Sequence, residues 1–234
     1  MQEHDAFRSE HSTYEVPLEI SMIARTILLL LALIAALPLA AQNDLYNNGP
    51  IVGDINAWDI TTFIVSDTFT LTSSTNSVNG LSFGAWLNPG DILQSAEVSI
   101  TSNPEGGTTY FAQTVAITQT GCFMNHSGYE LCQETGTFNS VELGAGTYWI
   151  NLTNARVGNG DEVYWDENDG QGCTSPGCPS QAFQSINGTI PSESFTIFGT
   201  VGGGSTPEPG SLLLFGSGVA GVVAWLRRSK ARSN

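Results

Sequence analysis

The stretch Leu81-Ser82-Phe83-Gly84-Ala85-Trp86-Leu87 decides the fold, because its apolar side chains recur at every second position. Successive side chains of a β-strand point to opposite faces, so this period forms one apolar face. The residues on that face are Leu81, Phe83, Ala85 and Leu87. The stretch therefore predicts a strand whose one side packs into a core.

The same alternation recurs along the chain, and no long helical period accompanies it between residues 42 and 201. The further alternating apolar sets are Val98 and Ile100; Val115 and Ile117; Tyr148, Ile150 and Leu152; Phe195 and Ile197. Asn-Gly, Pro-Gly and Gly-Gly pairs, which favour turns, separate these segments. We therefore expect residues 42–201 to form an all-β domain, an antiparallel β-sandwich of the jelly-roll kind.

The charge of the chain is strongly negative, with a formal net charge of −15 at pH 7. Between residues 42 and 205 the only Lys or Arg is Arg156. Binding to phosphate groups needs Lys and Arg, so nucleic acid is not an expected partner. Neutral ligands and cations suit such a surface better.

The N-terminal region has the features of a secretory signal peptide over residues 22–41. Met22-Ile23-Ala24-Arg25 supplies a short positive segment, Thr26 to Leu39 an apolar core, and Ala40-Ala41 small residues for cleavage. Residues 1–21 are charged and lack an apolar period. We interpret them as a non-native N-terminal extension, with the true start at Met22.

The C-terminal region contains three parts in a fixed order. Pro207-Glu208-Pro209 comes first, then an apolar run from Leu212 to Leu226, then the basic cluster Arg227-Arg228-Ser229-Lys230. Proline keeps the first part extended, and the apolar run is about long enough to cross a bilayer as a helix. The basic cluster favours a cytoplasmic C-terminus. Residues 202–206 are rich in glycine and are expected to be a linker.

These three parts closely resemble the PEP-CTERM sorting tail of exported bacterial proteins, here over residues 207–234. The resemblance implies that an exosortase-type membrane protease recognises Pro207, Glu208 and Pro209. It also implies a transient inner-membrane anchor, followed by release to the cell surface or the extracellular matrix. Such proteins are associated with exopolysaccharide and biofilm, and the tail alone carries this implication.

The four cysteines lie in the β-rich region, and an even number in an exported chain indicates disulfide bonds. Three pairings are possible. We favour Cys122–Cys132 and Cys173–Cys178, because each pair is close in sequence and encloses a turn-rich loop. A zinc site is the alternative, although the spacing does not match short Cys-x-x-Cys knuckles.

The acidic segment from Asp161 to Gly170 is the most concentrated group of polar side chains. Calcium prefers several oxygen ligands on a bendable loop, so Asp166, Asn168 and Asp169 are a candidate calcium site. The segment does not match an EF-hand loop, and the alternative is a solvated acidic loop. No other cofactor is expected.

The same segment contains aromatic residues beside carboxylates, which is chemistry suited to sugar recognition. A ring stacks on the apolar face of a pyranose while acids and amides accept its hydroxyl groups. Trp165, Tyr164 and Asp166 are therefore candidate ligand-binding residues. The alternative is that these aromatic side chains belong to the core.

We expect no catalytic residues. His126 is the only histidine after residue 11, and it lies between two cysteines without a nucleophile motif nearby. A glycoside hydrolase needs only two carboxylates, and pairs can be drawn among Asp161, Glu162, Asp166 and Glu167.

The leading interpretation is a non-catalytic surface or matrix protein that binds polysaccharide. A structural or adhesive matrix protein without a specific ligand is the first alternative, and a hydrolase using a carboxylate pair is the second.

Overall fold

The computed structural model describes residues 43–202. The expected extension (1–21), signal peptide (22–41), Pro-Glu-Pro signal and C-terminal helix lie outside these residues. Within residues 43–202 there is no helix long and apolar enough to span a bilayer.

The described residues form 12 strands. Their bounds are β1 (Asn43–Asn47), β2 (Ala57–Asp59), β3 (Val65–Leu71), β4 (Asn76–Leu87), β5 (Leu93–Asn103), β6 (Gly106–Met124), β7 (Glu130–Leu143), β8 (Gly146–Val157), β9 (Tyr164–Asp166), β10 (Ala182–Gln184), β11 (Gly188–Ile190) and β12 (Phe195–Val201). All pairings are antiparallel, which confirms the prediction of an all-β, antiparallel domain.

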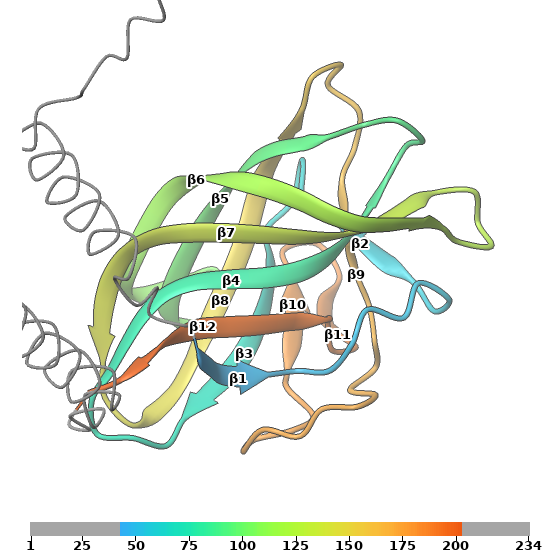
Figure 1. Ribbon diagram of the computed structural model, residues 1–234. Coiled ribbons are helices and arrows are strands. Elements are labelled where there is room, and N and C mark those ends of the chain that lie inside the picture. Colours follow the sequence, from blue (N-terminus) through green and yellow to red (C-terminus); the bar gives the residue numbers. More distant parts are fainter. Residues whose placement is uncertain (1–42, 203–234) are drawn as a thin grey trace, which may run out of the picture. The chain divides into compact units, whose positions relative to one another are not determined.

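The hydrogen-bonded order is β1-β12-β4-β7-β6-β5-β8-β3-β10-β11, with β9 pairing both β2 and β4. The pairs β5–β6, β4–β7 and β3–β8 are nested inside one another along the chain, which is the pairing of a rolled-up hairpin. In Figure 1, β12, β4 and β7 lie in front of β8 and β3. The strands form one curled antiparallel sheet, where the sequence predicted two separate sheets.

The long strand β6 causes this difference, because it belongs to both halves of the sheet. Its first part pairs with β5 up to Ala116, and its second part pairs with β7 from Ile117 onward. The sequence shows two short alternating segments here and gives no sign that one strand runs through both.

The apolar face of β4 lies in the core, as its period predicts. Leu81, Phe83, Ala85 and Leu87 are buried, and Phe83 contacts Trp165 edge-on with ring centroids 6.1 Å apart. Replacing such a buried phenylalanine by alanine costs about 3–5 kcal/mol of stability.

The opposite face of β4 is covered as well. Trp86 on that face is only 7% exposed. Gly84 lies close to the segment that contains Ile51, because an added Cβ would come within 3.0 Å of Ile51 Cγ1. A segment of the chain therefore crosses the outer face of β4.

Both predicted disulfide bonds are present, Cys122–Cys132 and Cys173–Cys178. The first joins the ends of β6 and β7, and the second closes the loop before β10.

Candidate ligand-binding site

Trp165 was predicted to stack on a sugar, and the structure shows that this is wrong for the folded conformation. Its exposed fraction is 0%, and its Nε1 donates a 2.9 Å hydrogen bond to the carbonyl oxygen of Ser194. Its ring also packs edge-on against Phe83 and Phe195. Trp165 is a core residue that connects β9, β4 and β12.

Asp166 is also buried, and its carboxylate is occupied by the protein. Oδ2 accepts a hydrogen bond from Val52 N at 2.9 Å, and Oδ1 accepts from Gly53 N at 3.0 Å and Trp86 Nε1 at 2.7 Å. Burial raises its pKa, and these donors oppose that shift. The predicted ligand-binding role of Asp166 is therefore corrected to a structural one, which fixes the segment that crosses β4.

The candidate calcium ligands do not form a common set of free oxygens. Asn168 is buried, its Nδ2 donates to the carbonyl of Asn48 at 2.7 Å, and its Oδ1 accepts from Gly170 N. Of the three candidate ligands, only Asp169 is exposed, and its backbone has a φ of 50°. Calcium binding by this loop stays a prediction that has lost Asp166 as a free ligand.

Among residues 43–202, the side chains of Cys122, Glu130 and Cys132 place their potential metal-ligating atoms within 4.8 Å of one another. Both sulfur atoms are in a disulfide bond, so they are not available as thiolates. The alternative of a cysteine zinc site does not fit this chemistry.

Tyr164 is the predicted ligand-binding residue that does reach a surface hollow. We call it the tyrosine hollow; it has a volume of about 380 Å³ and is lined by Asn88, Tyr129, Asp161 and Glu162 as well. The Tyr129 and Tyr164 rings meet edge-on at 5.7 Å. The Tyr164 hydroxyl donates to Glu162, and burial first, then this contact, raises the Tyr164 pKa. The phenol is therefore neutral at any physiological pH.

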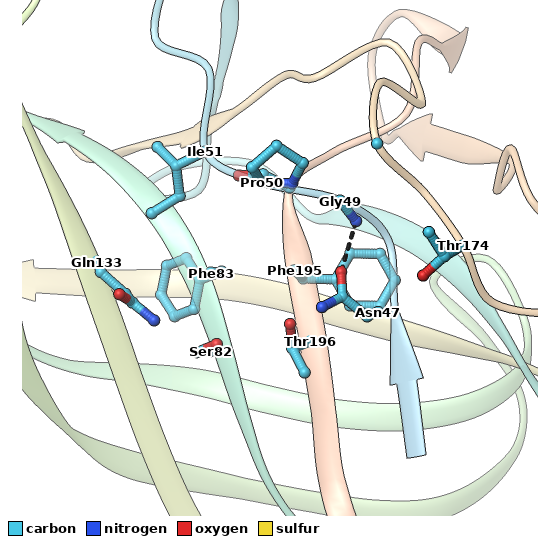
Figure 2. A pocket seen from close by; sticks show the side chains of 12 residues that line it. Asn47, Gly49, Pro50, Ile51, Ser82, Phe83, Gln133, Thr174, Phe195 and Thr196 are labelled. Carbon is cyan, nitrogen blue, oxygen red and sulfur yellow. Dashed lines mark hydrogen bonds between the residues drawn. The ribbon is translucent and has the colours of Figure 1, made fainter. Parts of the chain in front are cut away.

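A larger hollow lies on the outer face of the same sheet, with a volume of about 460 Å³. We call it the groove, and Figure 2 shows it. Its lining residues are Asn47, Gly49, Pro50, Ile51, Ser82, Phe83, Gln133, Gly172, Thr174, Ser194, Phe195 and Thr196.

Three strands supply the polar floor of the groove. Ser82 of β4 pairs with Thr196 of β12, and Gly84 of β4 pairs with Gln133 of β7. Residues that pair directly point to the same face of a sheet, so these side chains gather on one side. Figure 2 shows Ser82, Thr196 and Gln133 on one side of the groove and Pro50 and Ile51 across from them.

The rest of the wall comes from two loops that pack tightly on each other. Gly49 has a φ of 101°, which favours glycine, and an added Cβ would collide with the carbonyl oxygen of Gln171. Asn47 N donates to Ser175 Oγ at 2.8 Å, which attaches the Cys173–Cys178 loop to β1. The disulfide loop thereby holds Thr174 at the edge of the groove.

None of the lining side chains of the groove carries a charge. Amide and hydroxyl groups can both donate and accept hydrogen bonds, and Pro50 and Ile51 add apolar surface. This combination fits a neutral ligand rich in hydroxyl groups. The sequence did not reveal it, because Ser82, Gln133 and Thr196 come together only through strand pairing.

His126, the histidine considered for catalysis, is exposed on the β6–β7 turn. Its Nδ1 lies 2.8 Å from Asp54 Oδ1. Of the carboxylates considered for a hydrolase, Asp166 and Glu167 are buried, whereas Asp161 and Glu162 line the tyrosine hollow.

Comparison with known proteins gives one match. A family model described as a PEP-CTERM protein-sorting motif matches residues 205–228. No curated protein and no solved structure matches the chain.

Proposed function

We propose that this PEP-CTERM domain-containing protein uses its β-rich domain as a non-catalytic module that binds neutral polysaccharide. The motif at residues 205–228 makes the chain a target of exosortase sorting and an exported, membrane-anchored precursor. Export brings the β-rich domain to the side of the membrane where extracellular polysaccharide and biofilm matrix lie. The disulfide bonds suit that oxidising location.

The uncharged groove is the observation that carries this proposal. A sugar presents hydroxyl groups at its edges and carbon–hydrogen bonds on its faces. Ser82, Gln133 and Thr196 offer hydrogen-bonding partners for the first, and Pro50 and Ile51 offer contact for the second. A net charge of −15 makes acidic sugars poor ligands, so a neutral chain is the best fit.

The test is binding of the purified protein to an array of neutral and charged glycans, followed by titration with the best ligand. Gln133→Ala removes an exposed amide from the groove, and we expect it to weaken binding about tenfold. Gln113→Ala on β6 is the matched control, because Gln113 is exposed and does not line the groove. Equal affinity of both variants and the wild type would place the site elsewhere.

The tyrosine hollow is the second candidate for the same activity. It is favoured by the half-buried Tyr129 and Tyr164 rings beside the amide of Asn88. If Tyr164→Ala loses glycan binding while Gln133→Ala keeps it, the binding site is this hollow.

Two other functions predict different results in the same experiments. A structural matrix protein would bind no glycan, yet its deletion would change the biofilm. A hydrolase would shorten a polysaccharide, and its activity would vanish in Asp161→Asn or Glu162→Gln.

A further inference from the structure

The carboxylate of Glu193 is buried and has no hydrogen-bond partner in the described part of the chain. Its exposed fraction is 0%, and neither Oε1 nor Oε2 accepts a hydrogen bond. A buried carboxylate is stable only when it is paired, ligated or protonated. Arg156, the one Lys or Arg of residues 43–202, is exposed and does not neutralise it.

Two more buried carboxylates lie around Glu193. Asp67 of β3 accepts a 2.8 Å hydrogen bond from Glu193 N, and Glu167 pairs with Glu193 in an isolated antiparallel bridge. Asp67 is 0% exposed and Glu167 is 4% exposed. Trp58 Nε1 donates to Glu167 Oε2 at 3.0 Å, and the side chain of Asn56 also bonds this carboxylate. The three acids come from β3, from the end of β9 and from the segment before β12.

Neutral oxygen atoms complete the surroundings of this cluster. Ser180 and Ser192 place their hydroxyl oxygens 2.6 Å apart, and both interact with the Asp67 carboxylate. The same two serines line a surface hollow of about 380 Å³. The hollow gives an ion a path from solvent to the edge of the acid cluster.

The cluster must take up either protons or a cation at neutral pH. Burial raises the pKa of Asp67 to about 7 and raises the pKa of Glu193 well above its ordinary value. The neighbouring charges of Asp67, Glu167 and Asp166 raise the Glu193 pKa further. Either bound protons or a bound cation can offset this buried charge, and the unpartnered carboxylate of Glu193 is the group free to ligate a cation.

We propose that Glu193, Asp67 and Glu167 bind a calcium ion together with the hydroxyl oxygens of Ser180 and Ser192. Calcium accepts six to eight oxygen ligands in flexible geometry, which suits carboxylates from three separate segments. Magnesium requires near-ideal octahedral geometry and is a poorer fit. The oxygens of the three acids do not all lie within 4.8 Å of one another, so ligation requires their side chains to move closer together, and the Glu193 carboxylate has no hydrogen bond to lose.

This ion links the two halves of the curled sheet, because β3 lies in one half and β12 in the other. The site adjoins the predicted Asp166, Asn168 and Asp169 loop, because Glu167 lies within that loop, but it uses a different set of carboxylates. It also goes beyond polysaccharide binding and does not depend on it.

The experiment uses the full chain, purified in detergent and treated with a chelator. At about pH 7.5, addition of about 5 mM calcium chloride should raise the melting temperature by about 4 °C. Terbium should bind competitively with calcium, and excitation of Trp58 and Trp165 beside the site should sensitise its luminescence. Glu193→Gln and Asp67→Asn should lose both responses, whereas Glu142→Gln, which is exposed on β7 and lies outside the hollow, should keep them.

Three outcomes would overturn the proposal. In the first, calcium and terbium have no effect on the wild type, and the cluster is protonated instead. In the second, Asp169→Asn loses the responses and Glu193→Gln keeps them, which places the ion in the predicted loop. In the third, Glu193→Gln and Asp67→Asn fold with the wild-type far-ultraviolet spectrum and still bind terbium with unchanged affinity.

Discussion

Trp86 Nε1 donates a 2.7 Å hydrogen bond to Asp166 Oδ1 and thereby joins residues 80 positions apart in the chain. The same carboxylate accepts hydrogen bonds from Val52 N and Gly53 N. One buried side chain therefore holds β4, β9 and the segment that crosses the outer face of the sheet.

We predict that Asp166→Ala lowers the free energy of unfolding by about 3 kcal/mol, because it leaves two buried and one half-buried N–H donor without an acceptor. Denaturant titration measures this change. Asp169→Ala, three positions along the chain and exposed, should change stability by less than about 0.5 kcal/mol. Equal stabilities of the two variants would contradict the role given to Asp166.

Glu134 should make the protein less stable as the pH rises. Its side chain is buried without a hydrogen-bond partner, and burial raises its pKa from 4.5 to about 8. Between these two values the folded state keeps a proton that the unfolded state has lost, so the free energy of unfolding falls as the pH increases. Asp67 and Glu193 act in the same direction.

The measurement is a series of melting curves from about pH 5 to about pH 8 in the presence of a chelator. Glu134→Gln should flatten the decline and gain about 1–3 kcal/mol at the alkaline end. Glu142→Gln, exposed on the same strand β7, is the control and should follow the wild type. A variant curve parallel to that of the wild type would show that Glu134 is charged at neutral pH in the folded state.

The two disulfide bonds should have different effects when they are removed. Loop-closure entropy assigns about 3 kcal/mol to Cys122–Cys132 and about 2 kcal/mol to Cys173–Cys178, because the first closes the longer loop. Only the second loop borders the groove. We therefore expect the double serine variant of Cys122 and Cys132 to lose more stability than that of Cys173 and Cys178. The double serine variant of Cys173 and Cys178 should lose more glycan binding. Calorimetry and glycan titration measure the two effects.

The sorting signal should be separable from folding. Replacing Pro207, Glu208 and Pro209 by alanine should leave the precursor in the membrane fraction, because the exosortase no longer recognises it. Fractionation and immunoblotting with an antibody to the β-rich domain measure this distribution. Alanine at Ser211, Ser217 and Ser229 changes the same region without altering the signal and should allow normal processing. Normal release of the first variant would mean that another feature directs sorting.

The sequence was sufficient for features that depend on neighbouring residues. The two-residue period of Leu81 to Leu87 predicted the buried face of β4, and the short separations of the cysteines predicted both disulfide bonds. Such features follow from local geometry alone.

Features that depend on distant segments could not be predicted. Trp165 has acidic neighbours in the sequence and looked exposed, but β12 and β4 cover it. Glu193 lies between two serines, and only tertiary packing makes it a buried acid. The groove needs three strands that lie more than 40 positions apart.

The position of β12 has a mechanical consequence for a protein that is tethered through its C-terminal end. The strand lies between β1 and β4 and is antiparallel to both, and Gly202 N still bonds to Thr75 O just beyond it. A pull along β12 therefore loads two rows of hydrogen bonds in shear at the same time, instead of opening them one by one. The strand at which the chain leaves the sheet is thus the one best placed to resist tension from the anchor.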